Sequence, residues 1–314
     1  MNQIDSTIAL GIGFPKAATT YVAAVLESHP EICFSPRKET RFFEKHADEI
    51  LNADTTAPTR SATVNNFESL WSDFNPRCHR IRAEWTVSYI AKTKSLRAIK
   101  HFFQNRADPI FLLGIRNPIE SVLSNYMYRA QQKASDAYKK SQLECMIQRP
   151  DIYLDPYDYY QHFKNFRTIF PQAKILLLPH RTIRLNRSVF FSGLFRNLKL
   201  SPWMGWNSIP PLNVSKAYRS RLVHRVSRSL TRRLYGDEVA RRVFRIPTTD
   251  PEVPALLRPL IRLNHNPGAY SWTPEAKEFA RKRLHDSAAR FIDLTWNDQN
   301  CIYVGSISSP SEIW

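Results

Sequence analysis

Short runs of apolar residues recur along the chain, and each is followed by a polar turn. They cover residues 8–12, 32–34, 81–85, 110–115 and 173–178. Helix-like stretches lie between several of them, at residues 19–28, 119 to about 133, and 188–198. A continuous apolar run such as residues 110–113 suits a sheet that is covered on both faces. The alternation therefore predicts an α/β fold with a mainly parallel central sheet flanked by helices.

The last third of the chain has a different pattern. From residue 216 to about 245, apolar positions recur every four residues among many arginines, which predicts a basic amphipathic helix or helix pair. Thr273 followed by Pro274 is a good start for a further helix. We therefore expect a helical C-terminal part within a single domain, residues 1–314. Residues 52–66, rich in Thr, Ala and Asn, are expected to form an exposed loop.

The charge is strongly positive. The 314 residues include 45 Lys and Arg against 28 Asp and Glu, a net charge of +17. Such a field attracts phosphates, sulfates, anionic glycans, nucleic acid or membrane surfaces. Because the sequence has no zinc-finger spacing, no RNP-type aromatic motif and no clear helix-turn-helix, nucleic acid is not an expected partner. A basic segment such as 216–245 is usually a solvated helix packed on a domain; the alternative is contact with an anionic glycan, a lipid-linked acceptor or a membrane surface.

The four cysteines lie far apart, without the spacing of metal ligands. No signal peptide is evident, and no apolar run reaches the roughly 18 residues that a membrane span requires. These features predict free thiols, a cytoplasmic location and no bound metal. They give no indication of the oligomeric state.

Residues 13–20, Gly-Phe-Pro-Lys-Ala-Ala-Thr-Thr, follow an expected strand and open an expected helix. A turn at this place directs backbone N–H groups and the positive end of the helix dipole toward one point. Lys16 adds a full charge, and Thr19 and Thr20 add hydroxyl donors, so the segment predicts an anion site. The alternative is an ordinary strand-to-helix loop capped by threonine.

A second strand-turn-helix segment covers residues 110–129. Arg116 at the strand end can bind a phosphate group through two hydrogen bonds, and Ser124 lies one to two helical turns further on. Asn117 and Pro118 are suited to begin the helix. The alternative for Arg116 is a surface arginine at a strand end.

The lysine of the first segment is not placed as in a nucleotide-binding Walker A loop, where it directly precedes the Ser or Thr. Here Lys16 comes three residues before Thr19. This arrangement resembles the 5′-phosphosulfate loop of sulfotransferases that use 3′-phosphoadenosine 5′-phosphosulfate (PAPS). The chain departs from that family at Ala18, where the family usually has glycine and where a methyl group is expected to require ordinary backbone angles.

The second segment is similar to the 3′-phosphate motif of the same family at Arg116, Asn117, Pro118 and Ser124. The resemblance implies that a late basic residue, Lys216 or Arg219, closes over the 3′-phosphate. The implied PAPS-binding residues are Phe14, Pro15, Lys16, Ala17, Ala18, Thr19, Thr20, Arg116, Ser124, Lys216 and Arg219.

Residues 35–43, Ser-Pro-Arg-Lys-Glu-Thr-Arg-Phe-Phe, resemble a segment of heparan sulfate sulfotransferases and their bacterial relatives, in which a glutamate is the base. Carried over, Glu39 is the candidate base, and Lys38 and Lys16 act beside the transferred group. A charged surface loop is the ordinary alternative. The preceding run, 32–34, is expected to lie next to the strand that ends in the 13–20 loop. His79 is the second candidate base, although a surface or capping role suits its surroundings better.

Residues 84–89, Glu-Trp-Thr-Val-Ser-Tyr, resemble a segment that lines the acceptor side in that branch. An edge strand whose aromatic residue packs in the core explains the same pattern equally well.

Taken as a whole, the resemblance implies a P-loop-like fold and transfer of a sulfuryl group from PAPS to a hydroxyl or amine, without a metal. The likeness at Glu39 favours a carbohydrate or glycan-like acceptor. A P-loop nucleotide-dependent phosphotransferase, or kinase, is the alternative function.

Overall fold

The computed structural model describes residues 7–52, 58–130, 132, 135–210, 226–227, 229–236, 254–255, 257–259 and 271–314. The chain forms two compact units. The first comprises Met1–Pro118, Pro156–Trp206 and Leu284–Trp314, and the second comprises Ile119–Asp155 and Asn207–Arg283. Within the expected basic segment, residues 226–227 and 229–236 are helical, and Lys216 and Arg219 lie outside the described residues.

The first unit contains a six-stranded sheet whose strand order is β2-β3-β1-β4-β5-β6. The strands are β1 (Thr7–Gly13), β2 (Ile32–Phe34), β3 (Ile81–Trp85), β4 (Ile110–Ile115), β5 (Ile175–Pro179) and β6 (Cys301–Tyr303). All five neighbouring pairs are parallel. The predicted α/β class with a parallel central sheet is therefore confirmed, and all five expected strands are present.

Helices connect the strands. They are α1 (Thr19–Glu27), α2 (Phe42–Lys45), α3 (Ala47–Asn52), α4 (Pro58–Glu68), α5 (Thr93–Phe103), α6 (Pro118–Ala130), α7 (Gln142–Gln148), α8 (Pro150–Tyr153), α9 (Tyr159–Ile169), α10 (His180–Leu185), α11 (Arg187–Asn197) and α14 (Pro274–Trp296). The expected helices at 19–28, 119–133, 188–198 and after Thr273 correspond to α1, α6, α11 and α14.

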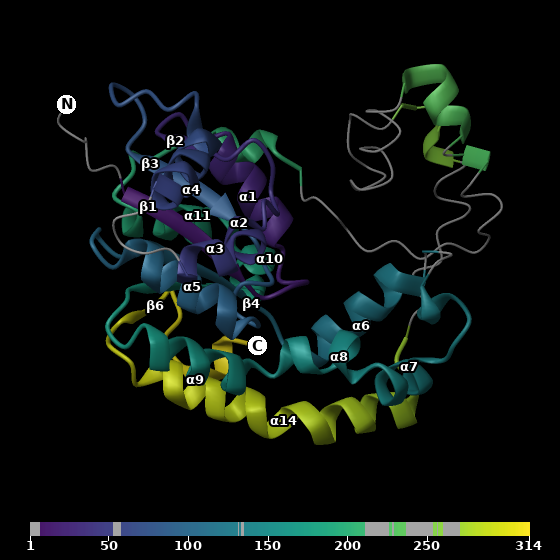
Figure 1. Cartoon of the computed structure of the whole chain (residues 1–314). Coiled ribbons are helices and arrows are strands. Elements are labelled where there is room, and N and C mark those ends of the chain that lie inside the picture. Colours follow the sequence, from purple (N-terminus) through teal and green to yellow (C-terminus); the bar gives the residue numbers. More distant parts are fainter. Residues whose placement is uncertain are drawn as a thin grey trace. The chain divides into compact units, whose positions relative to one another are not determined.

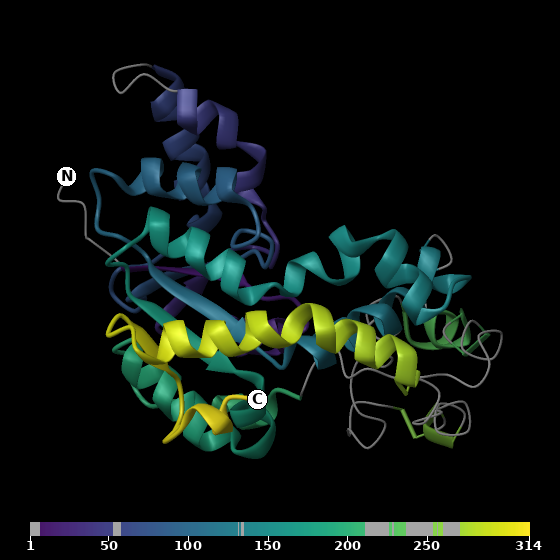
Figure 2. The same ribbon diagram turned by 90° about the horizontal axis from the view of Figure 1, so that it is seen from below.

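Aromatic contacts join helices of the first unit to one another. Tyr21 of α1 meets Phe191 of α11 edge to face at 5.6 Å, which joins these two helices. Phe163 of α9 meets Phe291 of α14 at 5.4 Å. Figures 1 and 2 show α9 in teal and the C-terminal half of α14 in yellow lying side by side. In Figure 1 this pair lies on the opposite side of the sheet from α1.

Glycines in two central strands allow other side chains to lie directly on the backbone. A Cβ atom on Gly11 of β1 would stand 2.2 Å from the indole ring of Trp85, and one on Gly13 would stand 2.5 Å from Ile90. On β4, a Cβ atom on Gly114 would stand 3.0 Å from the methyl group of Thr19. The carboxyl ends of β1, β3 and β4 are therefore packed closely because β1 and β4 lack side chains there.

The second unit is held by its own polar contacts. Tyr153 donates to Asp136 over 2.8 Å, and the amide of Asn125 donates to the carbonyl oxygen of Ile152 over 3.0 Å. Ser141 and Glu144 form a capping box at the start of α7. Helices α6 and α14 each contribute residues to both units.

Two expectations about strand positions are wrong. Strand β2 pairs with β3 and not with β1, so one strand separates it from the 13–20 loop. Strand β3, expected as an edge strand in one interpretation, lies between β2 and β1. Three residues in β2 are too few to indicate a neighbour, and β3 is an interior strand although Arg82 and Glu84 interrupt its apolar residues.

The expectation of an exposed loop at residues 52–66 is also wrong, since residues 58–66 belong to α4. This helix has little amphipathic pattern, and its main apolar anchor, Phe67, lies just beyond the stretch in question. Phe67 is fully buried and contacts Phe42 at 5.0 Å and Phe102 at 4.7 Å. Packing of Phe67 in the core therefore stabilises a helix that the composition of the segment does not predict.

All four cysteines are free; Cys33 and Cys145 are buried, whereas Cys78 is exposed. Within the described ranges, no helix is both long enough and apolar enough to cross a membrane.

We expect Gly11→Ala to destabilise the protein by about 3 kcal/mol, because a new methyl group would stand 2.2 Å from the fully buried indole ring of Trp85. Gly236→Ala is the control. Gly236 has a φ of +86° and no atom within 4 Å of a built Cβ, so we expect a cost of only about 1 kcal/mol. Urea unfolding of the two variants measures both values, and equal costs would contradict the packing argument.

Candidate active site

The carboxyl ends of β1 and β4 lie side by side at the point where the order of the strands reverses. Strands β2 and β3 lie on one side of β1, and β4, β5 and β6 lie on the other. The turn after β1 is fastened to β4, since the N–H of Phe14 donates to the carbonyl oxygen of Gly114 over 2.7 Å. Ligands of parallel α/β sheets bind at such switch points, at the carboxyl edge.

The turn has an unusual backbone. Lys16 and Ala18 both adopt left-handed angles, with φ values of 66° and 59°. The expectation that the methyl group of Ala18 requires ordinary backbone angles is therefore wrong, and the alanine adopts the conformation for which glycine is normally selected. Ala18 caps α1 without any side-chain hydrogen bond, and no acidic residue occupies the first turn of that helix. The positive end of the α1 dipole thus faces the turn without a side-chain cap.

The predicted PAPS-binding side chains differ in exposure. Phe14 and Ala17 are 0% and 1% exposed, and the Phe14 ring stacks on Tyr159 with centroids 3.8 Å apart. These two residues can offer only backbone groups to a ligand. The side chain of Thr19 is buried against Gly114. The remaining residues of the turn, Pro15, Lys16, Ala18 and Thr20, are half-buried.

The two basic motifs meet. The guanidinium group of Arg116, one residue after β4, donates to the carbonyl oxygen of Lys16 over 3.2 Å. A contact between positions 100 residues apart brings both candidate phosphate-binding segments to one place. Ser124 is buried on α6 and belongs to the second unit, so its partnership with Arg116 stays a prediction.

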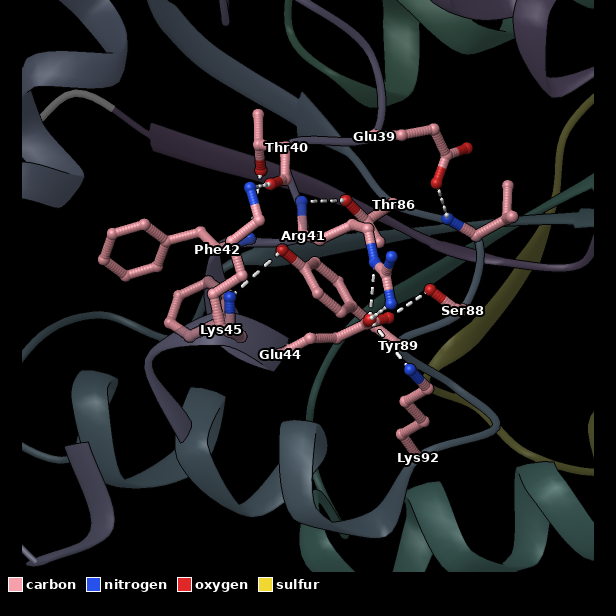
Figure 3. A network of polar contacts seen from close by, with 12 residues as sticks. Glu39, Thr40, Arg41, Phe42, Glu44, Lys45, Thr86, Ser88, Tyr89 and Lys92 are labelled. Atoms are coloured by element: carbon pink, nitrogen blue, oxygen red, sulfur yellow. Dashed lines mark hydrogen bonds and ion pairs between the residues drawn. The ribbon is translucent and has the colours of Figure 1, made fainter. Parts of the chain in front are cut away.

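Glu39 is held at the same edge of the sheet by the residues that follow β3. Its N–H donates to the carbonyl oxygen of Trp85 over 2.7 Å, and its Oε2 accepts the N–H of Val87 over 3.2 Å (Figure 3). Lys38 forms an ion pair with Oε1 of Glu39. The N–H of Thr86 in turn donates to the carbonyl oxygen of Gly11 over 2.8 Å. Glu39 is thereby connected to β1 just before the basic turn, although β2 is not adjacent to β1.

Two further glutamates, Glu44 and Glu84, form hydrogen bonds with residues of this segment, and Figure 3 shows those of Glu44. Burial alone would raise the pKa of Glu44, but hydrogen bonds from Lys92, Ser88 and Arg41 outweigh it and hold the pKa below its ordinary value. Burial raises the pKa of Glu84 to about 7, although hydrogen bonds from Thr86 and Thr40 oppose the shift. The nearby charge of Glu39 adds to the rise.

The network around Glu84 was missed at the level of sequence, where the segment 84–89 was interpreted only as acceptor lining or core. A glutamate inside a strand that is expected to be covered on both faces is the signal that could have found it, because buried carboxyl groups require hydrogen-bond partners.

His79 is not a second candidate base. It precedes β3 and so lies at the amino end of that strand, whereas Glu39 lies beyond its carboxyl end. Its Nδ1 accepts the N–H of Asn75 over 2.9 Å, and its own N–H donates to the carbonyl oxygen of Asn75 over 2.7 Å. These contacts confirm the capping role that was the alternative for this residue.

The arrangement suits an anionic ligand. Lys16, Arg116 and the amino end of α1 supply positive charge around one turn, and Glu39 supplies a carboxylate at the neighbouring strand end. Among the described residues, no group of three or more His, Cys, Asp or Glu side chains is placed to hold a metal ion.

Comparison with known proteins identifies a similar fold. No protein-family model and no curated protein matches the chain. Among solved structures, the chain is similar to a sulfotransferase from Alicyclobacillus acidocaldarius, with a TM-score of 0.55 and 16% sequence identity. The likeness covers 92% of this chain and 96% of that one. At this identity the match shows that the two proteins share a fold.

We expect Ala18→Gly to stabilise the protein by about 1 kcal/mol, because glycine adopts the left-handed conformation without the steric cost that alanine has there. Ala17→Gly is the matched control, since Ala17 is buried and is not among the residues with a positive φ. It should destabilise the protein by about 1 kcal/mol. Chemical unfolding measures both, and destabilisation by Ala18→Gly would contradict the left-handed assignment.

Proposed function

We propose that this chain is a PAPS-dependent sulfotransferase that transfers a sulfuryl group to a hydroxyl or amine of an acceptor. The observation that carries the proposal is the contact of Arg116 with the carbonyl oxygen of Lys16, because it joins two basic strand-to-helix turns at one switch point. PAPS has phosphate groups at both the 5′ and 3′ positions, and two adjoining cationic turns suit such a donor. The shared fold with a sulfotransferase supports the same class of reaction.

In this proposal each turn holds one end of the donor. Lys16 and the backbone N–H groups at the start of α1 bind the 5′-phosphosulfate and stabilise the negative charge that develops on the leaving phosphate. Arg116 binds the 3′-phosphate, and Ser124 is its expected partner. Lys216 or Arg219 is the expected basic residue that closes over the same phosphate. PAPS itself supplies the activated sulfuryl group.

Glu39 acts as the general base. As the acceptor oxygen forms its bond to sulfur and the bond between sulfur and the phosphate oxygen breaks, the acceptor proton passes to the Glu39 carboxylate. Lys38, paired with Oε1, holds that carboxylate in place and adds positive charge beside the transferred group. Because Glu39 matches the base of the heparan sulfate and bacterial carbohydrate branch, we propose a carbohydrate or glycan-like acceptor.

The direct experiment is incubation of the purified chain with PAPS labelled in its sulfuryl group and a panel of glycan, lipid, peptide and small hydroxyl acceptors. Thermal-shift measurements with 3′-phosphoadenosine 5′-phosphate, ATP and NAD precede it. Stabilisation by the bisphosphate and label transfer to one acceptor class support the proposal. Stronger stabilisation by ATP would favour the alternative, a nucleotide-dependent phosphotransferase.

We expect 3′-phosphoadenosine 5′-phosphate to bind at least about tenfold more tightly than ADP, because Arg116 adds a charge-assisted contact to the 3′-phosphate worth about 1.5–3 kcal/mol. Arg116→Ala should erase that preference in isothermal titration calorimetry. Arg181→Ala is the control, since Arg181 also follows a strand end but donates to the carbonyl oxygens of Ser311 and Trp314. Equal affinity of the wild type for the two nucleotides would refute the assignment of Arg116.

We expect Glu39→Gln to lower turnover about 10²- to 10⁴-fold while it leaves bisphosphate affinity unchanged, because glutamine keeps the shape and removes the basicity. Glu49→Gln, a change to an exposed carboxylate in α3, should retain wild-type turnover. Steady-state kinetics with saturating PAPS measures both variants. If Glu39→Gln keeps more than about a tenth of the activity, another group is the base.

A further inference from the structure

The segment that carries Glu39 contains two residues with strained backbone angles. Glu39 and Arg41 both have left-handed angles, with φ values of 66° and 57°. Each such residue without a glycine's freedom costs on the order of 1 kcal/mol or more, so it persists only where surrounding contacts impose it. In this segment those contacts determine where the Glu39 carboxylate points.

The contacts come from the residues that end β3 and follow it. The N–H of Glu39 donates to the carbonyl oxygen of Trp85, and the N–H of Arg41 donates to Oγ1 of Thr86 over 3.1 Å. Figure 3 shows the bond between Arg41 and Thr86 next to the bond between Val87 and the Glu39 carboxylate. Both left-handed residues are thus fixed to one strand end.

Glu84 accepts hydrogen bonds from both the loop and the residue that follows β3. Its Oε1 accepts a hydrogen bond from Oγ1 of Thr40 over 2.7 Å and a second from Oγ1 of Thr86 over 2.6 Å. Thr40 lies between the two left-handed residues, and Thr86 is the acceptor for Arg41. The carboxyl group of Glu84 therefore joins the loop to the end of β3, and it is 1% exposed.

The carboxyl group of Glu84 is buried, and within the described part of the chain only one of its two oxygens is hydrogen-bonded. Its Oε2 is buried and has no hydrogen-bond partner among the described residues. The ionisable groups that interact with it are Glu39 and Tyr89, and burial is the main cause of its raised pKa. An acid kept in such a place without a partner for one oxygen is not explained by packing alone.

We propose that Glu84 is the positioning residue of the candidate base, and that it fixes the Glu39 carboxylate through Thr40 and Thr86. The role in turnover rests on the proposed function, which assigns proton removal to Glu39. The positioning itself is a property of the folded chain, and it can be measured without a substrate.

The substrate-independent experiment is hydrogen exchange followed by mass spectrometry on the full chain. Glu84→Leu keeps similar bulk and removes the acceptor, so amide exchange in residues 38–43 should become at least about tenfold faster, while exchange in α1 stays unchanged. Thr86→Val, which removes one hydroxyl and preserves shape, should accelerate the same segment if Glu84→Leu does not fold. Unchanged exchange in residues 38–43 would overturn the proposal.

The kinetic experiment uses Glu84→Leu, Glu84→Gln and their combinations with Glu39→Gln. Glu84→Leu should lower kcat about 10- to 100-fold with little change in the KM for PAPS. Glu84→Gln, whose amide oxygen can still accept from both threonines, should retain at least about half of wild-type kcat. In the Glu39→Gln background, Glu84→Leu should cause no further loss, because it acts through Glu39.

The two experiments separate the two claims. Additive losses in the double variant would overturn the proposal, because they would show that Glu84 affects turnover independently of Glu39. Faster exchange in residues 38–43 together with no sulfuryl transfer by the wild type would refute the proposed function and leave the structural anchoring of Glu39 in place.

Discussion

The close approach of neighbouring chain segments to the backbone of β1 and β4 is the constraint on which the rest of the site depends. Gly11 admits the indole ring of Trp85, and Gly114 admits the methyl group of Thr19 at the start of α1. A side chain at either position would collide with the Trp85 ring or press on the first residue of α1. The basic turn and the acidic segment reach the same edge because two central strands lack side chains there.

Both halves of the site use left-handed residues that are not glycine. Lys16 and Ala18 shape the turn that faces α1, and Glu39 and Arg41 shape the segment that follows β2. Strained backbone of this kind is common where function fixes geometry more tightly than stability would. The two halves differ in how the strain is held: hydrogen bonds to β4 and Arg116 hold the first, and a buried carboxyl group holds the second.

The sequence predicted what depends on local patterns. Short, mainly apolar runs located five strands, and the lysine and arginine after two of them located the basic turns. Strand order was not predictable, because β2 has three residues and its partner is set by long-range packing. The conformation of Ala18 was predicted wrongly because the prediction used only the intrinsic backbone preference of alanine. The turn is also held by a hydrogen bond to Gly114, about a hundred residues away, which the local sequence does not reveal. The network of Thr40, Glu84 and Thr86 joins positions more than forty residues apart, so no local pattern reveals it.

The raised pKa of Glu84 links folding to proton uptake. Its ordinary pKa is 4.5 in an unfolded chain, and in the folded chain it is about 7. Between these values the folded chain keeps a proton on Glu84 that the unfolded chain has released, so folding takes up a proton from solution. The contribution of Glu84 to stability is therefore complete below about pH 4.5 and is lost as the pH rises through about 7. Mild acidification therefore increases the contribution of Glu84 to the stability of the folded chain. Carboxylates in surface ion pairs have the opposite effect, because acid removes the charge on which those pairs depend.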